Sequence, residues 1–340
     1  NTAVGNAALY GNTTGVENTA VGGSALIANT SGNYNTALGR SALQANTTAS
    51  YNTAVGYQAA YANTTGTGLV VVGRAALYTN TTGSSNTAVG NIALYANTTG
   101  NYNAAFGEST LSANTTASGN SGFGHEALSA NTTGANNVAV GLQALKSNTT
   151  ASNNTAVGYQ AGYSNTTGSV TAFGQGSLFS NVTGDGNSAF GVSALTANTG
   201  NYNSAFGWRA GYGNTSGTQN LFVGYATGYG NTTGGNNAAV GNTAMYTNTT
   251  GSYNVALGVD ALRLNTTASN NTAVGYRAGY SLTTGASNTI VGNDAGYSVT
   301  GDLNTLVGKD AGYYITSGTK NTVIGKYNGN QGGLNITTSS

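Results

Sequence analysis

A word of 17 residues recurs from one end of the chain to the other. The stretch NTAVGYQAGYSNTTG that begins at Asn154 returns almost unchanged from Asn52 and from Asn271. Twenty units start with such a word, and units of 16 residues occur only at Asn154, Asn187 and Asn288; the starts are Asn1, Asn18, Asn35, Asn52, Leu69, Asn86, Asn103, Asn120, Asn137, Asn154, Val170, Asn187, Asn203, Asn220, Asn237, Asn254, Asn271, Asn288, Asn304 and Asn321. A short fixed period is the signature of a solenoid, in which each repeat forms one coil that packs on the next. We therefore expect a continuous solenoid array at 1–320 and a degenerate last repeat at 321–340 that caps the array or takes part in assembly.

The residue pattern of each unit predicts a short strand followed by a turn. Counting places from the first residue of a unit, Thr at place 2 and Val at place 4 alternate across Ala at place 3, which is the pattern of a short strand. Place 5 is Gly in every unit, where a strand that must turn needs a positive φ or close backbone approach. A second apolar patch follows at places 8–10. Seventeen residues hold about two such strands and two turns, so the sequence predicts an all-β fold, a parallel β-solenoid or β-roll.

The stacking of coils has two consequences. At ~4.8 Å per coil, twenty coils would make a rod roughly 95 Å long. Asn opens 18 of the 20 units, and stacked identical Asn side chains form hydrogen-bonded amide ladders. We expect such a ladder here.

We assign Val at place 4 to the core, which turns place 3 outward. Along most of the chain place 3 is Ala, a flat strip suited to a neighbouring molecule, but it becomes larger toward the C-terminus. An outward face has little reason to gain apolar bulk unless something covers it. This predicts self-association, lateral or end to end, through Phe222, Ile290, Leu306 and Val323.

Places 9 and 10 follow a rule of their own. Where place 9 is Gly in a complete unit, place 10 is Tyr, as in Gly162-Tyr163, whereas Leu at place 9 is followed by various residues such as Gln44. We expect a Tyr ring to fill the space that Leu otherwise occupies, so that volume is conserved in each layer.

Composition excludes several classes of function. Only 5% of residues are charged, the net charge is +1 and Cys is absent, so there is no basic stripe for nucleic acid, no apolar stretch long enough to span a membrane and no metal-spaced cluster of ligands. Most charges fall at places 6 and 7, where we expect exposed corners. His125, the single histidine, lies beside Glu126 on such a corner, Trp208 is expected to be exposed, and Met245 stands in a Leu position. We expect neither an enzyme nor a cofactor.

The words of the repeat resemble those of known surface proteins. NNTAVG at Asn153–Gly158 is similar to the NSVAIG-type signature of trimeric autotransporter adhesin heads, and the whole chain resembles the NTA[VI]G…NTTG arrays of bacterial and phage tail-fibre-like proteins. The resemblance implies a left-handed parallel β-roll, commonly trimeric, that is extracellular or on the cell surface and displays surfaces for attachment.

The NTTG turn completes an N-glycosylation sequon in phase in fifteen units, and a sequon needs an exposed turn to carry a glycan. Alternatively, Asn, Thr and Gly serve there simply as good turn formers. Covalent glycans are the one non-protein group we expect, and out-of-phase sequons begin at Asn153, Asn270 and Asn335. The candidate sites are Asn12, Asn29, Asn46, Asn63, Asn80, Asn97, Asn114, Asn131, Asn148, Asn165, Asn181, Asn214, Asn231, Asn248, Asn265 and Asn335.

Three classes of function stay open. The first is a self-associating structural subunit of an extracellular fibre or surface appendage, glycosylated on its NTT turns. The second is an adhesin or phage tail-fibre shaft that binds cell-surface glycans or receptors. The third is an ice-binding solenoid that uses ranks of Thr, which the Gly-containing turns around Thr13 and Thr14 make less suitable.

Overall fold

The computed structural model describes residues 1–329, and the chain divides into two compact units, Asn1–Ser169 and Val170–Ser340. The described part contains strands and turns but no helix. In the first unit the strands are β1 (Thr2–Val4), β2 (Thr19–Val21), β3 (Thr36–Leu38), β4 (Thr53–Val55), β5 (Val70–Val72), β6 (Thr87–Val89), β7 (Ala104–Phe106), β8 (Ser121–Phe123), β9 (Val138–Val140) and β10 (Thr155–Val157). In the second they are β11 (Val170–Phe173), β12 (Asn187–Phe190), β13 (Ser204–Phe206), β14 (Leu221–Val223), β15 (Ala238–Val240), β16 (Val255–Leu257), β17 (Thr272–Val274), β18 (Thr289–Val291), β19 (Thr305–Val307) and β20 (Thr322–Ile324).

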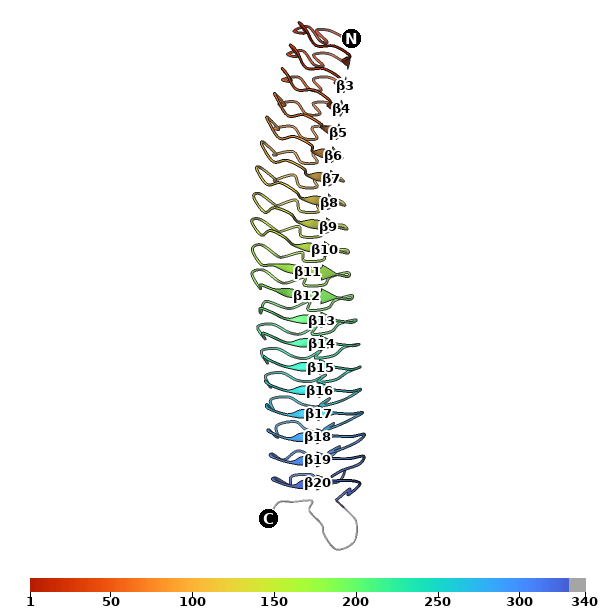
Figure 1. Ribbon diagram of the computed structural model, residues 1–340, viewed down its shortest axis with the longest axis vertical. Coiled ribbons are helices and arrows are strands. Elements are labelled where there is room, and N and C mark those ends of the chain that lie inside the picture. The colour runs from red at the N-terminus through yellow and green to blue at the C-terminus, as the bar shows by residue number, and fades with distance from the viewer. Residues whose placement is uncertain (330–340) are drawn as a thin grey trace. The chain divides into compact units, whose positions relative to one another are not determined.

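Within each unit every strand pairs in parallel with the strand of the next coil, as Figure 1 shows. The register joins equal places of successive repeats: Thr2 lies opposite Thr19, and Val4 opposite Val21. β20 pairs with β19 in the same way, so the coil pattern extends into the degenerate last repeat. The parallel β-solenoid predicted from the 17-residue period is confirmed.

Each coil holds one short strand, whereas we expected two. The patch at places 8–10 does not extend, because the residues at places 7 and 9 adopt left-handed backbone conformations, with φ of +58° at Ser24 and +51° at Leu26. Alternating left-handed residues turn the chain back on itself instead of propagating a strand. Coil-to-coil hydrogen bonds persist through the turn, since Leu26 N–H donates to the Ala42 carbonyl (3.1 Å).

The strand faces the core with place 3, so our assignment of place 4 to the core is wrong. Ala20 is fully buried, while its neighbours Thr19 and Val21 are exposed and half-exposed. Period-two alternation tells which residues share a face but not which face points inward. The coil is thin, and Ala at place 3 leaves room for Leu26 at place 9, which is also fully buried.

The predicted self-association residues therefore belong to the core. Phe222, Ile290 and Leu306 have no exposed surface, and Val323 is 4% exposed. Their bulk fills the interior next to Gly at place 9: a Cβ atom on Gly211 would lie 2.7 Å from Phe222 Cδ2, and one on Gly312 would lie 2.9 Å from Leu306 Cδ2. These residues are unavailable to another molecule.

Tyr at place 10 does not fill the space of Leu, so that prediction is also wrong. The ring of Tyr163, which follows Gly162, remains half-exposed, as does Tyr78, which follows Leu77. Tyr rings of successive coils stack on one another outside the core, with centroids 4.9 Å apart for Tyr61 and Tyr78. Bulk at place 3 is instead accommodated beside Gly at place 9 in particular coils, as at Phe222 and Leu306.

Candidate functional site

The Asn residues at place 1 form a buried amide ladder, as predicted. The backbone N–H of Asn35 donates to Asn18 Oδ1 of the preceding coil (2.9 Å), and Asn35 Nδ2 donates to the Ala49 carbonyl of its own coil (2.9 Å). The first bond joins neighbouring coils and the second closes one coil on itself. The Asn at place 1 thus stabilises the closure of its own coil and the stacking of that coil on the preceding one.

A second ladder runs along place 12, the Asn of the NTTG turn. Asn46 Nδ2 donates to Asn29 Oδ1 (2.8 Å) and to the Ala49 carbonyl (3.0 Å), and its side chain is fully buried. Both N–H groups of the amide are therefore used inside the molecule. The Ala49 carbonyl accepts from both ladders and so ties them together in this coil.

This placement corrects our expectation that the phased sequon residues lie on exposed turns. Fourteen of them have no exposed surface, which leaves no accessible amide nitrogen for a glycan in the folded chain: Asn29, Asn46, Asn63, Asn80, Asn97, Asn114, Asn131, Asn148, Asn165, Asn181, Asn214, Asn231, Asn248 and Asn265. Asn12, in the first coil, is half-exposed, but its Nδ2 donates to the Gly15 carbonyl (3.0 Å). Asn335 lies outside the described residues.

The second ladder ends at Asn265. In the coils that follow, place 12 is taken by Leu282, Val299 and Ile315, all fully buried. Asn265 Oδ1 consequently has no hydrogen-bond partner. The core exchanges an amide column for an apolar one here, while the first ladder continues, with Asn288 Nδ2 donating to Asn271 Oδ1 (3.0 Å).

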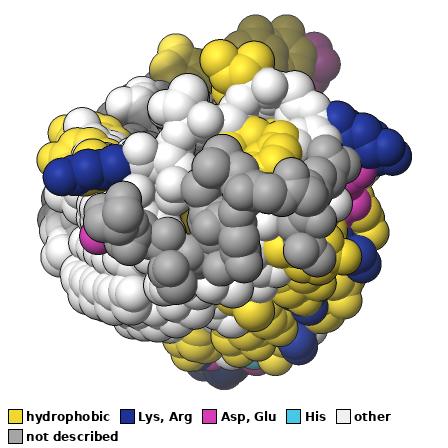
Figure 2. Space-filling model, turned by 90° about the horizontal axis from the view of Figure 1, so that it is seen from below, with side chains coloured by type: hydrophobic (Ala, Val, Ile, Leu, Met, Phe, Trp, Pro, Cys, Tyr) yellow, Lys and Arg dark blue, Asp and Glu magenta, His cyan; other side chains and the backbone are white. Residues whose placement is uncertain are grey.

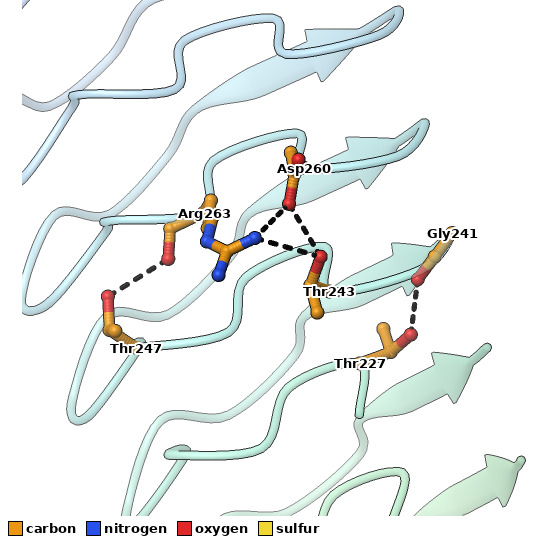
Figure 3. Close-up of polar contacts among 6 residues, drawn as sticks. All are labelled: Thr227, Gly241, Thr243, Thr247, Asp260 and Arg263. Carbon is orange, nitrogen blue, oxygen red and sulfur yellow. Dashed lines mark hydrogen bonds and ion pairs between the residues drawn. The ribbon is translucent and has the colours of Figure 1, made fainter. Parts of the chain in front are cut away.

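The charged residues at place 6, such as Arg40 and Arg74, are exposed as expected, whereas those at place 7, such as Asp260, are half-buried. Figure 2 shows Lys and Arg side chains projecting at the rim of the outline. In Figure 3, Arg263 Nη1 lies 2.5 Å from Asp260 Oδ1, which also accepts a hydrogen bond from Thr243 Oγ1 (2.5 Å). Thr247 Oγ1 donates to the Arg263 carbonyl (2.9 Å), and Thr227 Oγ1 donates to the Gly241 carbonyl. The three Thr hydrogen bonds connect successive coils, whereas Arg263 and Asp260 pair within one coil.

His125, Met245 and Trp208, each the only residue of its type, have the exposure or burial that we predicted. The side chain of His125 is 48% exposed, with Nδ1 3.9 Å from Glu126 Oε2, and Met245 is fully buried. Trp208 is 38% exposed and stacks on Tyr225. Hydrogen bonds from Lys146 and Gln143 lower the pKa of Glu126.

The outward face of the sheet is a surface that the sequence analysis missed. It consists of places 2 and 4 of each coil, and we call it the sheet face. No residue at either place is charged. Large apolar side chains on it are substantially exposed, at 47% for Leu38, 37% for Phe106 and 41% for Phe206. Rings of neighbouring coils stack along it, with centroids 4.9 Å apart for Phe106 and Phe123.

Residues 1–329 contain no group of three or more His, Asp or Glu side chains placed to hold a metal ion. In the same range no helix has the length and apolar character needed to cross a membrane. Comparison with known protein families and with curated proteins gives no match.

Proposed function

We propose that the chain is a structural subunit of an extracellular fibre or surface appendage, and that it associates with copies of itself through the sheet face. The observation that carries the proposal is the uncharged, partly apolar character of this face. A contiguous apolar surface that is exposed on a protein often marks an interaction site. Here most charges stand at places 6 and 7, and none stands at places 2 or 4.

The interior supports a structural role. The Asn residues that recur at places 1 and 12 are buried along most of the chain and hydrogen-bond one coil to the next. The resemblance of the repeat words to adhesin heads and tail-fibre-like proteins supports a position outside the cell.

A second copy of this chain is the partner that fits the sheet face. The sheet face runs along the ten strands of one unit, so a second copy can lie against it over many coils. The exposed rows repeat at the spacing of the coils, and a second solenoid offers matching rows. Its own sheet face is equally uncharged, so burying the two together leaves no charge without a partner.

A matched pair of variants tests the proposal. Leu38→Lys with Phe106→Lys places two charges on the sheet face, at sites that are 47% and 37% exposed. The control, Tyr57→Lys with Tyr95→Lys, places the same charges at corner sites that are 46% and 37% exposed. Sedimentation velocity should show that the first variant dissociates and the control assembles like the parent chain. Equal behaviour of the two would remove the sheet face from the interface.

An adhesin or tail-fibre shaft that binds cell-surface glycans or receptors remains the alternative function. Half-exposed aromatic residues at the corners, such as Trp208 stacked on Tyr225 with the Arg209 guanidinium over its ring, favour it. Such flat apolar platforms with a cation beside them are suited to sugar rings. Binding of the chain to a glycan array, abolished by Trp208→Ala, would support this alternative.

A further inference from the structure

The sequons outside the repeat phase differ from the phased ones in where their side chains lie. Asn153 and Asn270 occupy place 17, the corner that precedes the strand, and both are exposed. Their backbone is left-handed, with φ of +62° at each, a conformation that Asn tolerates better than most residues. Each backbone N–H bonds to the preceding coil, at 3.0 Å to the Ala135 carbonyl and 3.1 Å to the Ser252 carbonyl.

The Asn and the Thr that define each of these sequons both reach the surface. In Asn153-Asn154-Thr155 the first residue is exposed and Thr155, the first residue of β10, is half-exposed. The middle residue, Asn154, is fully buried and continues the place 1 ladder, its N–H donating to Asn137 Oδ1 (2.9 Å). Asn270-Asn271-Thr272 repeats this arrangement before β17.

The phased sequons have the opposite arrangement. In Asn46-Thr47-Thr48 the Asn side chain is buried with both N–H groups bonded, and only the hydroxyl-bearing residues reach the surface. A glycan on Asn46 would have to break the ladder and expose the core. A glycan on Asn153 or Asn270 would extend from a corner into solvent.

We propose that Asn153 and Asn270 are N-glycosylation sites of the folded chain, and that the phased Asn residues are not. The donor is a glycan linked to a polyprenyl pyrophosphate. The Asn amide nitrogen forms a bond to C1 of the first sugar, the bond from C1 to the pyrophosphate oxygen breaks, the amide proton passes to a base of the transferring enzyme, and polyprenyl pyrophosphate leaves. The proposal rests on the extracellular position in the proposed function.

The chain supplies its own matched controls. Asn136 and Asn236 also occupy place 17, are exposed, have φ of +58° and are followed by a buried Asn. They differ in the third residue, which is Val138 or Ala238 instead of Thr. These two corners should carry no glycan.

The experiment treats the folded chain with an oligosaccharyltransferase and a polyprenyl-pyrophosphate-linked glycan, followed by glycopeptide mass spectrometry. Among the sequons of residues 1–329 we expect occupancy at Asn153 and Asn270 only, loss with Thr155→Val and Thr272→Val, and a new glycan at Asn136 with Val138→Thr. The proteolytic peptide that contains Asn153-Asn154-Thr155 confirms that the enzyme is active.

Modification of that peptide without modification of folded Asn153 and Asn270 would overturn the proposal, and so would a glycan on a ladder residue such as Asn131 in the folded chain. The readout is the mass of glycopeptides and is independent of assembly. Failure of self-association therefore leaves this result unaffected, and the two proposals fail separately.

Discussion

The ring of Phe222 fills the space beside Gly211, where a Cβ atom on residue 211 would lie 2.7 Å from Phe222 Cδ2. On its other side the same ring lies against Gly228, the place 9 residue of its own coil, and a Cβ there would clash with the ring carbons. One large side chain at place 3 thus replaces the Leu side chains missing from two adjacent coils. The compensation therefore operates both within one coil, at Gly228, and toward the preceding coil, at Gly211.

The compensation between places 3 and 9 can be measured by a double-mutant cycle. Phe222→Ala alone should destabilise the chain by ~3–5 kcal/mol because it leaves a cavity. Gly228→Leu alone should also destabilise, because the new side chain meets the Phe222 ring. The double variant restores the residues that are common in other repeats, Ala at place 3 and Leu at place 9. It should be more stable than either single variant in denaturant unfolding. Strict additivity of the two losses would contradict the packing described here.

The place 12 ladder predicts unequal costs for the same substitution along the chain. In Asn131→Leu, Asn148 Nδ2 loses its acceptor and the partners Asn114 Oδ1 and Gly134 O lose a donor. An unsatisfied buried polar group costs ~1–3 kcal/mol. Asn265→Leu orphans no donor, since Asn265 Oδ1 has no partner, and it places Leu next to Leu282. Thermal melts should show the larger loss for Asn131→Leu, and the reverse order would argue against the ladder.

Gly at place 5 allows the coils to approach at the end of the strand. At Gly124 φ is +132°, and a Cβ would lie 2.6 Å from the Gly141 carbonyl oxygen. Gly124→Ala should therefore cost at least ~1–3 kcal/mol of unfolding free energy from backbone strain alone. Gly23→Ala is the control, because a Cβ there meets nothing closer than the Asn6 carbonyl oxygen at 4.0 Å. A similar loss at both sites would show that close approach is not the cause.

The stacked Tyr rings predict a loss of stability in alkali. Burial, with the neighbouring Tyr61, Tyr95 and Tyr57, raises the pKa of Tyr78 above its ordinary value of 10.0. The folded state then holds the phenol proton more tightly than the unfolded state does, so this contribution is present below about pH 10 and is lost as pH rises through the folded-state pKa. Denaturant unfolding at increasing pH should show the decline, with a shallower slope for Tyr78→Phe. An unchanged slope would exclude Tyr78 as a source of the effect.

The period, the parallel stacking and the place 1 ladder could be predicted from sequence because each depends only on repetition. The inward face could not be predicted from alternation, which has two equivalent phases. A usable signal was present all the same: Phe222, Ile290 and Leu306 each share a coil with Gly at place 9, as expected of two core positions that exchange volume. The rule has departures: Val71 shares its coil with Leu77, and Gly162, Gly211 and Gly279 share their coils with Ala at place 3.

The burial of the phased sequons could not be predicted from the sequence for a different reason. Asn, Thr and Gly are typical of exposed turns, and the same Asn is equally suited to a buried ladder once identical coils stack. Only the placement of the turn against the next coil separates the two. Asn46 and Asn153 both begin sequons, yet one is fully buried and the other exposed.

Self-association is tested most directly by the molar mass of the protein, measured by light scattering over a wide range of concentration. The uncharged sheet face predicts masses that are multiples of the 33.6 kDa chain and that increase with concentration. A mass of one chain at every concentration would contradict the proposal that the sheet face binds a second copy.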